Sequence, residues 1–145
     1  MSLATVVTKS VSQNGIPSVN ITNTITGAQT PPLDVTVPVA TPLTVNDGIG
    51  VLYYAALQML YITPDSLDVD VKFYAATAAG GALINTIHVH AGEAYVWDSN
   101  SGGTNPLGTT NALSMTVTAT AFVKGNASGG TPTGTDVHIR TSLSA

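Results

Sequence analysis

Apolar and polar residues alternate along most of this chain, and this period of two constrains the fold more than any other feature of the sequence. The segments from Leu33 to Val39 and from Val69 to Phe73, for example, place an apolar residue at every second position. Successive side chains of a β-strand point to opposite faces, so each such segment predicts a strand with one buried face. Turn signals separate about eight or nine such segments, the pattern typical of an antiparallel β-sandwich or jelly roll.

The composition also favours an all-β fold. Charged residues make up 8% of the chain, against roughly 25% in an average soluble domain, and Thr, Ser, Asn and Gly dominate the polar part. Thr is β-branched and suits a half-exposed strand, whereas a chain poor in Lys and Glu offers little that favours helix. The length of 145 residues suits one core rather than two. We therefore predict a single domain over residues 1–145, with at most one short helical turn and with residues 1–12 as a possible N-terminal arm or strand.

The first two strands should form a hairpin. They are expected near residues 4–12 and 18–26, and Asn14-Gly15 between them readily adopts the positive φ of a tight turn. A third strand is expected over residues 33–39. Because Pro38 lacks an amide donor, this strand should lie at a sheet edge or end there.

The apolar run from Val51 to Ile62 cannot be assigned by periodicity alone. We expect a short helical turn near residues 54–56 and then a buried strand over residues 57–62. Residues 41–50, before this run, are expected to form a loop. The remaining strands are expected near residues 68–73, 84–90, 94–98, 113–121 and 137–143.

Charge and composition exclude several classes of function. The net charge is -4 with 4 Lys and Arg residues, which leaves no basic patch for nucleic acid. No stretch reaches the roughly 20 apolar residues of a membrane span, so we expect no membrane partner. The chain has no cysteine, which excludes a disulfide framework and a thiolate metal site. The lack of cysteine and of a signal-peptide pattern at the start leads us to expect folding in a reducing cell interior.

The sequence also lacks recognisable catalytic motifs. It contains no Gly-x-Ser-x-Gly turn for a serine nucleophile, and its glycine-rich stretches do not end in the Gly-Lys-Thr/Ser of a phosphate-binding loop. We therefore expect no enzymatic activity, no catalytic residues and no cofactor.

Histidines supply the most specific alternative. His88 and His90 are two apart on an expected strand, so both side chains project from one face and could bind a metal. With Glu93 and His138 they resemble the metal motifs of a cupin, but the spacing from His90 to Glu93 is one residue short and that before His138 is one residue long. An error of one residue on a strand sends a side chain to the opposite face. We expect no metal, and a cupin-like metal-binding protein remains an alternative.

Carboxylates and aromatic residues give two weaker hypotheses. Asp65, Asp68 and Asp70 could bind Ca²⁺, although they more simply solvate one strand face. The aromatic residues could form a sugar platform, which leaves a carbohydrate-binding β-sandwich module as a further alternative. More often such residues anchor a core or a subunit contact, and our core or interface candidates are Tyr53, Tyr54, Leu57, Tyr61, Tyr95 and Trp97.

Several short segments resemble one family. Residues 87–97 contain Ala-Gly followed by Trp97, a Gly/Ser loop leads to Asn105-Pro106-Leu107, and residues 113–118 form a strand ending Thr-Val-Thr. Near the start, residues 24–27 read Thr-Ile-Thr-Gly. Together these motifs, spread over roughly residues 4–123, resemble small virion structural proteins of tailed bacteriophages and prophages.

The resemblance implies a β-sandwich that decorates or cements the outside of a phage head, with a tail- or fibre-associated virion protein as an alternative. The expected partners are the phage major capsid protein and further copies of the chain, with a trimer suggested by a place on a capsid lattice. The expected location is the virion, assembled in the host cytoplasm. The N-terminal segment could add to a neighbour's sheet.

Overall fold

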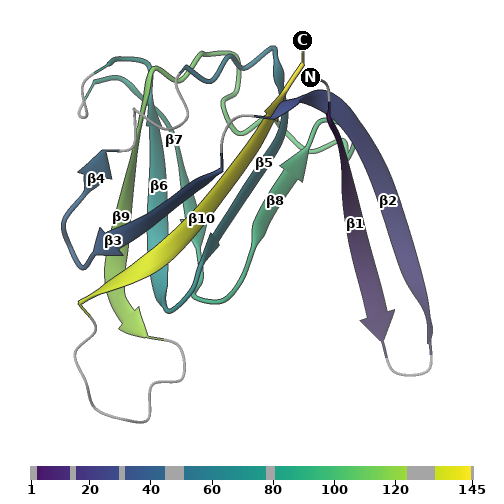
Figure 1. Cartoon of the computed structure of the whole chain (residues 1–145), viewed down its shortest axis with the longest axis horizontal. Helices are drawn as coiled ribbons and strands as arrows, with labels where there is room; N and C mark the ends of the chain where they lie inside the picture. Colours follow the sequence, from purple (N-terminus) through teal and green to yellow (C-terminus); the bar gives the residue numbers. More distant parts are fainter. Residues whose placement is uncertain are drawn as a thin grey trace.

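The computed structural model describes residues 3–13, 16–29, 32–44, 51–77, 81–123 and 133–144. In these residues the chain forms two antiparallel sheets and no helix (Figure 1). The predicted all-β class and the sandwich are therefore confirmed. The strands are β1 (Leu3–Gln13), β2 (Ile16–Gln29), β3 (Leu33–Pro38), β4 (Leu43–Thr44), β5 (Leu57–Pro64), β6 (Leu67–Tyr74), β7 (Leu83–Val89), β8 (Tyr95–Asp98), β9 (Ser114–Val123) and β10 (Gly134–Leu143).

The described residues differ from the sequence-based expectation in strand number. Short β4 lies in the segment that was expected to be loop, because Leu43 and Thr44 pair with Val117 and Thr116 of β9. A strand of two residues is too short to show alternation in the sequence. The described strands divide into sheets of six and four, and the jelly-roll variant of the sandwich stays a prediction. The expected Asn14-Gly15 turn and most of the loop before Gly134 lie outside the described residues.

The larger sheet runs in the order β1-β2-β10-β5-β8, and β3 also pairs with β10. Strand β10 has β5 along one side, while β3 and the end of β2 follow one another along its other side. Strand β3 is therefore an edge strand that ends at Pro38, as the missing amide donor predicted. The smaller sheet runs in the order β4-β9-β6-β7.

The core lies between the two sheets, where the apolar sides of their strands meet. A fully buried residue of this kind contributes about 1.5–3 kcal/mol relative to an exposed one. Leu57 and Trp97, two of the sequence-based candidates, belong to this core. Its side chains that are at most 1% exposed include Val37, Leu60, Ile62, Leu67, Val69, Val71, Phe73, Val117, Val137 and Ile139.

One turn precedes β5 where a short helical turn was expected. The amides of Ala56 and Leu57 both donate to the carbonyl oxygen of Tyr53, each at 3.0 Å. The chain then enters β5 directly, and the amide of Ser144 after β10 donates to Ala56 O. This turn therefore ties the end of β10 to the start of β5.

Candidate functional site

A long β-hairpin stands apart from the sandwich. Strands β1 and β2 pair continuously from Leu3 opposite Gly27 to Gln13 opposite Ile16, with one bulge between Val11 and Gln13. Figure 1 shows the two strands leaving the body side by side. We call residues 3–29 the arm. The segment over residues 1–12 that the sequence suggested as an arm thus supplies, from residue 3, the first strand of this hairpin.

The arm is attached at its base. The last residues of β2, Ala28 and Gln29, pair with the end of β10. Ile25 of β2 is 1% exposed and packs with Met59 of β5 and Val96 of β8, in a cluster separate from the main core. Among the described residues, a short ladder and a small apolar cluster therefore hold the arm to the body.

The outer part of the arm carries little protection against pairing. Among the described strands, β1 pairs with β2 alone, and β2 gains a second partner only near its end. Natural edge strands are commonly protected by charges or prolines, and the sequence of the arm contains one of each, Lys9 in β1 and Pro17 at the start of β2. Val6 is 59% exposed. The arm therefore presents long, nearly uncharged strand edges.

A second feature is a ladder of paired aspartates and histidines on the outer face of the smaller sheet. Asp70 of β6 lies directly opposite His88 of β7, and His90, which follows the last residue of β7, contacts Asp68. Asp70 Oδ1 lies 2.7 Å from His88 Nδ1, and Asp68 Oδ2 lies 2.9 Å from His90 Nδ1. A diagonal distance of 3.6 Å joins Asp68 Oδ2 to His88 Nε2. We call these four residues the Asp–His ladder.

The environment of the ladder shifts two of its pKa values. Burial of Asp68 acts to raise its pKa. The amide of Ala91 donates to Asp68 Oδ1 at 2.8 Å and His90 lies beside it, and both lower the pKa. The net shift of the Asp68 pKa is downward. The hydrogen bond to Asp70 raises the pKa of His88, although partial burial opposes the shift. The ladder therefore favours a charged carboxylate at Asp68 and a positive charge beside it.

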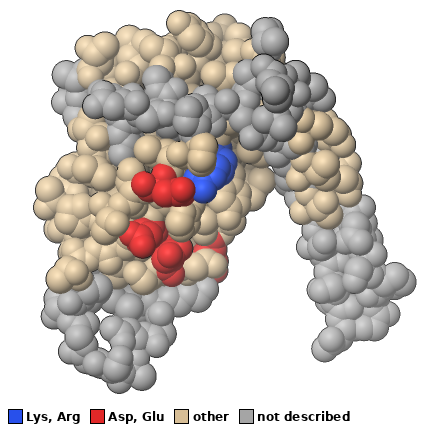
Figure 2. All heavy atoms as spheres, viewed as in Figure 1, with Lys and Arg blue, Asp and Glu red and all other residues tan. Residues whose placement is uncertain are grey.

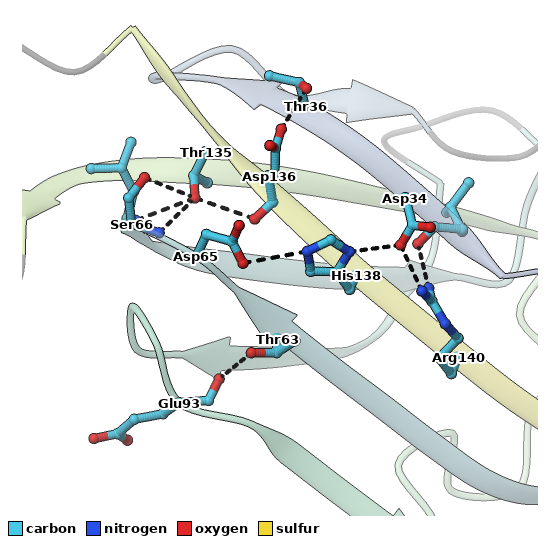
Figure 3. Close-up of polar contacts among 12 residues, drawn as sticks. Asp34, Thr36, Thr63, Asp65, Ser66, Glu93, Thr135, Asp136, His138 and Arg140 are labelled. Carbon is cyan, nitrogen blue, oxygen red and sulfur yellow. Dashed lines mark hydrogen bonds and ion pairs between the residues drawn. The ribbon is translucent and has the colours of Figure 1, made fainter.

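Another polar cluster lies on the outer face of the larger sheet (Figure 3). His138 Nδ1 lies 2.7 Å from Asp34 Oδ1, and His138 Nε2 lies 3.3 Å from Asp65 Oδ1. Arg140 Nη2 donates to the same oxygen of Asp34 at 2.8 Å. Figure 2 shows acidic and basic side chains gathered over β3 and β10 on an otherwise weakly charged face. Arg140 and, when protonated, His138 therefore offset part of the negative charge of the aspartates on the β10 face.

The contacts of this cluster also shift pKa values. The hydrogen bond to Asp34 raises the pKa of His138, while some burial opposes the shift. The hydrogen bonds from His138 and Arg140 lower the pKa of Asp34. Both shifts favour the charged pair.

The structure separates the residues of the cupin-like hypothesis. His88 and His90 alternate with buried Ile87 and Val89 on β7, whereas His138 lies between core residues on β10. They therefore face away from one core on different sheets. Glu93 accepts a hydrogen bond from Thr63 through its backbone carbonyl, and Figure 3 shows its carboxylate pointing away from His138.

The Ca²⁺ hypothesis fails for a related reason. Asp65 lies in the turn before β6 and contacts His138, whereas Asp68 and Asp70 contact the histidines of β7. Asp65 therefore belongs to the cluster around His138, whereas Asp68 and Asp70 belong to the Asp–His ladder, so the three carboxylates do not share one site. The sequence pattern missed the pairing of Asp-x-Asp with His-x-His, although two motifs of equal spacing on consecutive strands were a signal for it.

The aromatic candidates divide between core and surface. Trp97 is 7% exposed, and its Nε1–H donates to Gly103 O at 3.2 Å. A buried indole cannot stack on a sugar ring, which removes the main support for a carbohydrate-binding module. Tyr61 and Tyr95 are half-buried. Tyr53 and Tyr54 are exposed and remain interface candidates.

Comparisons with known proteins add little to this geometry. No protein-family model matches the chain, and no curated protein sequence matches it. A solved structure described as "Bacillus endospore appendages form a novel family of disulfide-linked pili" is similar over 99% of this chain and 92% of that chain, with 14% identity and a TM-score of 0.37. At this TM-score the similarity indicates neither a shared fold nor a shared function. The described residues include no helix long and apolar enough to cross a membrane.

Proposed function

We propose that this chain is a non-enzymatic structural protein that assembles with copies of itself through its arm. Within this role we propose a phage virion protein, most specifically one that decorates the outside of a capsid. The observation that carries the assembly role is the arm, which leaves the sandwich as a long hairpin with open edges. The resemblance of residues 4–123 to small virion proteins supports the phage assignment.

The physical argument begins with the stability of a hairpin. Two antiparallel strands without a further partner are marginally stable in water. The strands of the arm are 11 and 14 residues long, about twice the usual length of a strand. A long hairpin whose described contacts with the body lie near its base gains hydrogen bonds when a neighbouring strand edge pairs with it.

The chemistry of the arm favours another copy as that neighbour. Its exposed described residues include Thr8, Thr22 and Thr24 beside Val6, so it offers hydroxyl and methyl groups with little charge. Among the strands that the structure describes, β7 and β8 lie at sheet edges, where an arm can pair with the body. In a closed symmetric assembly each subunit donates one arm and receives one.

The assembly role can be tested by charging the arm while preserving its hairpin. Val6 and Thr24 are exposed cross-strand partners, so Val6→Lys with Thr24→Glu places opposite charges where they support the pair. Thr36→Lys is the matched control, because it places a lysine opposite exposed Asp136 on the sandwich. Light scattering after size exclusion should give a multiple of 14.7 kDa for the wild type and the control, and a smaller species for the arm variant. A wild-type monomer at tens of micromolar, or an arm variant that assembles normally, would contradict the proposal.

The virion assignment needs its own experiment. Purified protein is mixed with mature phage heads, tails and intact virions of the host strain, and bound protein is measured by sedimentation and electron microscopy. Saturable binding to the head supports decoration, whereas binding to tails or fibres transfers the proposal to that part of the virion. Binding to none of them would refute the phage assignment and leave the assembly role to the light-scattering result.

A further inference from the structure

The Asp–His ladder goes beyond an assembly role. We propose that Asp68, His88 and His90 form a binding site for a divalent transition metal of the Zn²⁺ class, with one coordination position open to solvent. The sequence led us to expect no metal, and its cupin-like alternative assigned Glu93 and His138 in place of Asp68. The proposal rests on the geometry of the β6–β7 pair and is independent of the arm.

The three proposed ligand atoms converge. Asp68 Oδ2 lies 2.9 Å from His90 Nδ1 and 3.6 Å from His88 Nε2, and one ligand atom from each residue lies within 4.8 Å of the others. Zn²⁺ binds histidine and carboxylate at about 2.0–2.2 Å in a tetrahedron, which sets neighbouring ligand atoms about 3.4 Å apart. The two distances to Asp68 Oδ2 bracket this value, and the two histidine ligand atoms, which lie within 4.8 Å of each other, would approach it through side-chain rotation.

The surroundings of these ligands match those of a metal site. His88 uses Nδ1 toward Asp70 Oδ1 at 2.7 Å, which fixes the ring so that Nε2 faces Asp68. The amide of Ala91 donates to Asp68 Oδ1 at 2.8 Å and leaves Oδ2 toward the two rings. Metal-binding histidines characteristically use their second ring nitrogen in this manner, and the partner is commonly a carboxylate. Asp70 is therefore a positioning residue for His88.

Burial and ligand type decide which metal is expected. The Asp68 side chain is 7% exposed, while those of His88 and His90 are 46% and 58% exposed. The carboxylate thus forms the floor of the site, and the imidazoles leave room for a water molecule on the outer side. Two imidazoles with one carboxylate suit Zn²⁺, Co²⁺ or Ni²⁺, whereas Ca²⁺ and Mg²⁺ prefer oxygen ligands throughout.

The test uses full-length protein without an affinity tag, stripped with a chelator and titrated calorimetrically with Zn²⁺. One Zn²⁺ per chain is expected, while Ca²⁺ should give no binding heat. His90→Gln and Asp68→Asn should each weaken Zn²⁺ binding at least about 10-fold, and Asp70→Asn should weaken it by about 10-fold. His138→Gln is the matched control, because His138 also contacts aspartates but lies on the other sheet; it should bind Zn²⁺ as the wild type does.

Two results with the wild type and the ligand variant would overturn the proposal, and a third comes from the control variant. One is a wild type that binds no stoichiometric Zn²⁺, and the other is binding that survives His90→Gln. Loss of binding in His138→Gln alone would likewise place the metal elsewhere and refute this site. Since His90 is exposed, its substitution should leave the fold intact, and circular dichroism of each variant checks this. A thermal unfolding temperature that Zn²⁺ raises in the wild type but not in His90→Gln gives a second readout.

Discussion

Ile25→Ala tests whether the arm and the sandwich are separate units of stability. Ile25 is almost completely buried, and among the described residues it packs with Met59 and the partly buried Val96, in a cluster outside the main core. If this contact docks the arm, its loss should release the arm and leave the sandwich folded. The effect should therefore appear locally rather than in global unfolding.

The magnitude follows from the burial of the side chain. Truncating a buried isoleucine to alanine costs about 2–5 kcal/mol in a dense core, and the small Ile25 cluster should fall at the lower end, at about 2 kcal/mol. A change of about 1.4 kcal/mol is tenfold in an opening equilibrium, so amides of β1 and β2 should exchange about 30-fold faster. The global free energy of unfolding should fall by less than about 1 kcal/mol. Leu60→Ala, at a position that is 0% exposed in the main core, should instead lower it by about 2–5 kcal/mol.

Two measurements separate these outcomes. Hydrogen exchange resolved by peptide reports the arm, and urea unfolding followed by fluorescence reports the sandwich, because Trp97 is the only tryptophan and lies in the main core. The reasoning is refuted if Ile25→Ala destabilises the Trp97 transition as strongly as Leu60→Ala does. It is equally refuted if exchange in β1 and β2 does not change.

Two further predictions concern β10. The hydrogen bond to Asp34 raises the pKa of His138. The contribution of His138 to stability is therefore complete below its unfolded pKa of about 6.5 and is lost as the pH rises through its folded pKa. The pKa of Asp34 is lowered, so the contribution of Asp34 persists down to about pH 4. The thermal unfolding temperature should therefore decline from about pH 6 to 8 in the wild type. His88, whose pKa is also raised, contributes to this decline, so His138→Gln should make the decline shallower without abolishing it. An unchanged slope would show that His138 does not contribute. Gly134→Ala should lower the free energy of unfolding by about 1–3 kcal/mol, because the new Cβ would lie 2.7 Å from the backbone oxygen of Val37. Urea unfolding measures this change. A change below about 0.5 kcal/mol would mean that edge strand β3 shifts away from the new Cβ at little cost.

Alternation located the strands because burial of one face is a local property of each segment. The register between strands is not local, and the β6–β7 pair shows why. Phe73 pairs with Asn85, but Tyr74 pairs with Leu83, so the register shifts by one residue near the turn. Counting inward from the turn without this shift would place Asp70 opposite Ile87 rather than His88. The equal spacing of Asp-x-Asp and His-x-His suggests that the two motifs pair, but their exact register depends on this shift, which the alternation does not show.

The aromatic candidates show a second limit of sequence reasoning. Trp97 and Tyr53 both looked like anchors, but only Trp97 lies on a strand whose inner face meets the core. Tyr53 lies in the turn before β5 and is 53% exposed. Residues in turns have no alternation from which a buried face can be inferred, so their exposure is decided by tertiary packing alone.

The arm and the Asp–His ladder lie on different parts of the molecule, and this separation predicts that assembly and metal binding are independent. The arm joins the larger sheet at β2, whereas the ladder lies on the outer face of the smaller sheet. Changes at distant sites without shared partners act nearly additively, so the Val6→Lys/Thr24→Glu variant should bind Zn²⁺ normally and His90→Gln should still assemble. A Zn²⁺-dependent increase in assembled mass would change that conclusion. The open coordination position would then take a ligand from a neighbouring subunit, and the exposed histidines of β7 would belong to the same interface that the arm creates.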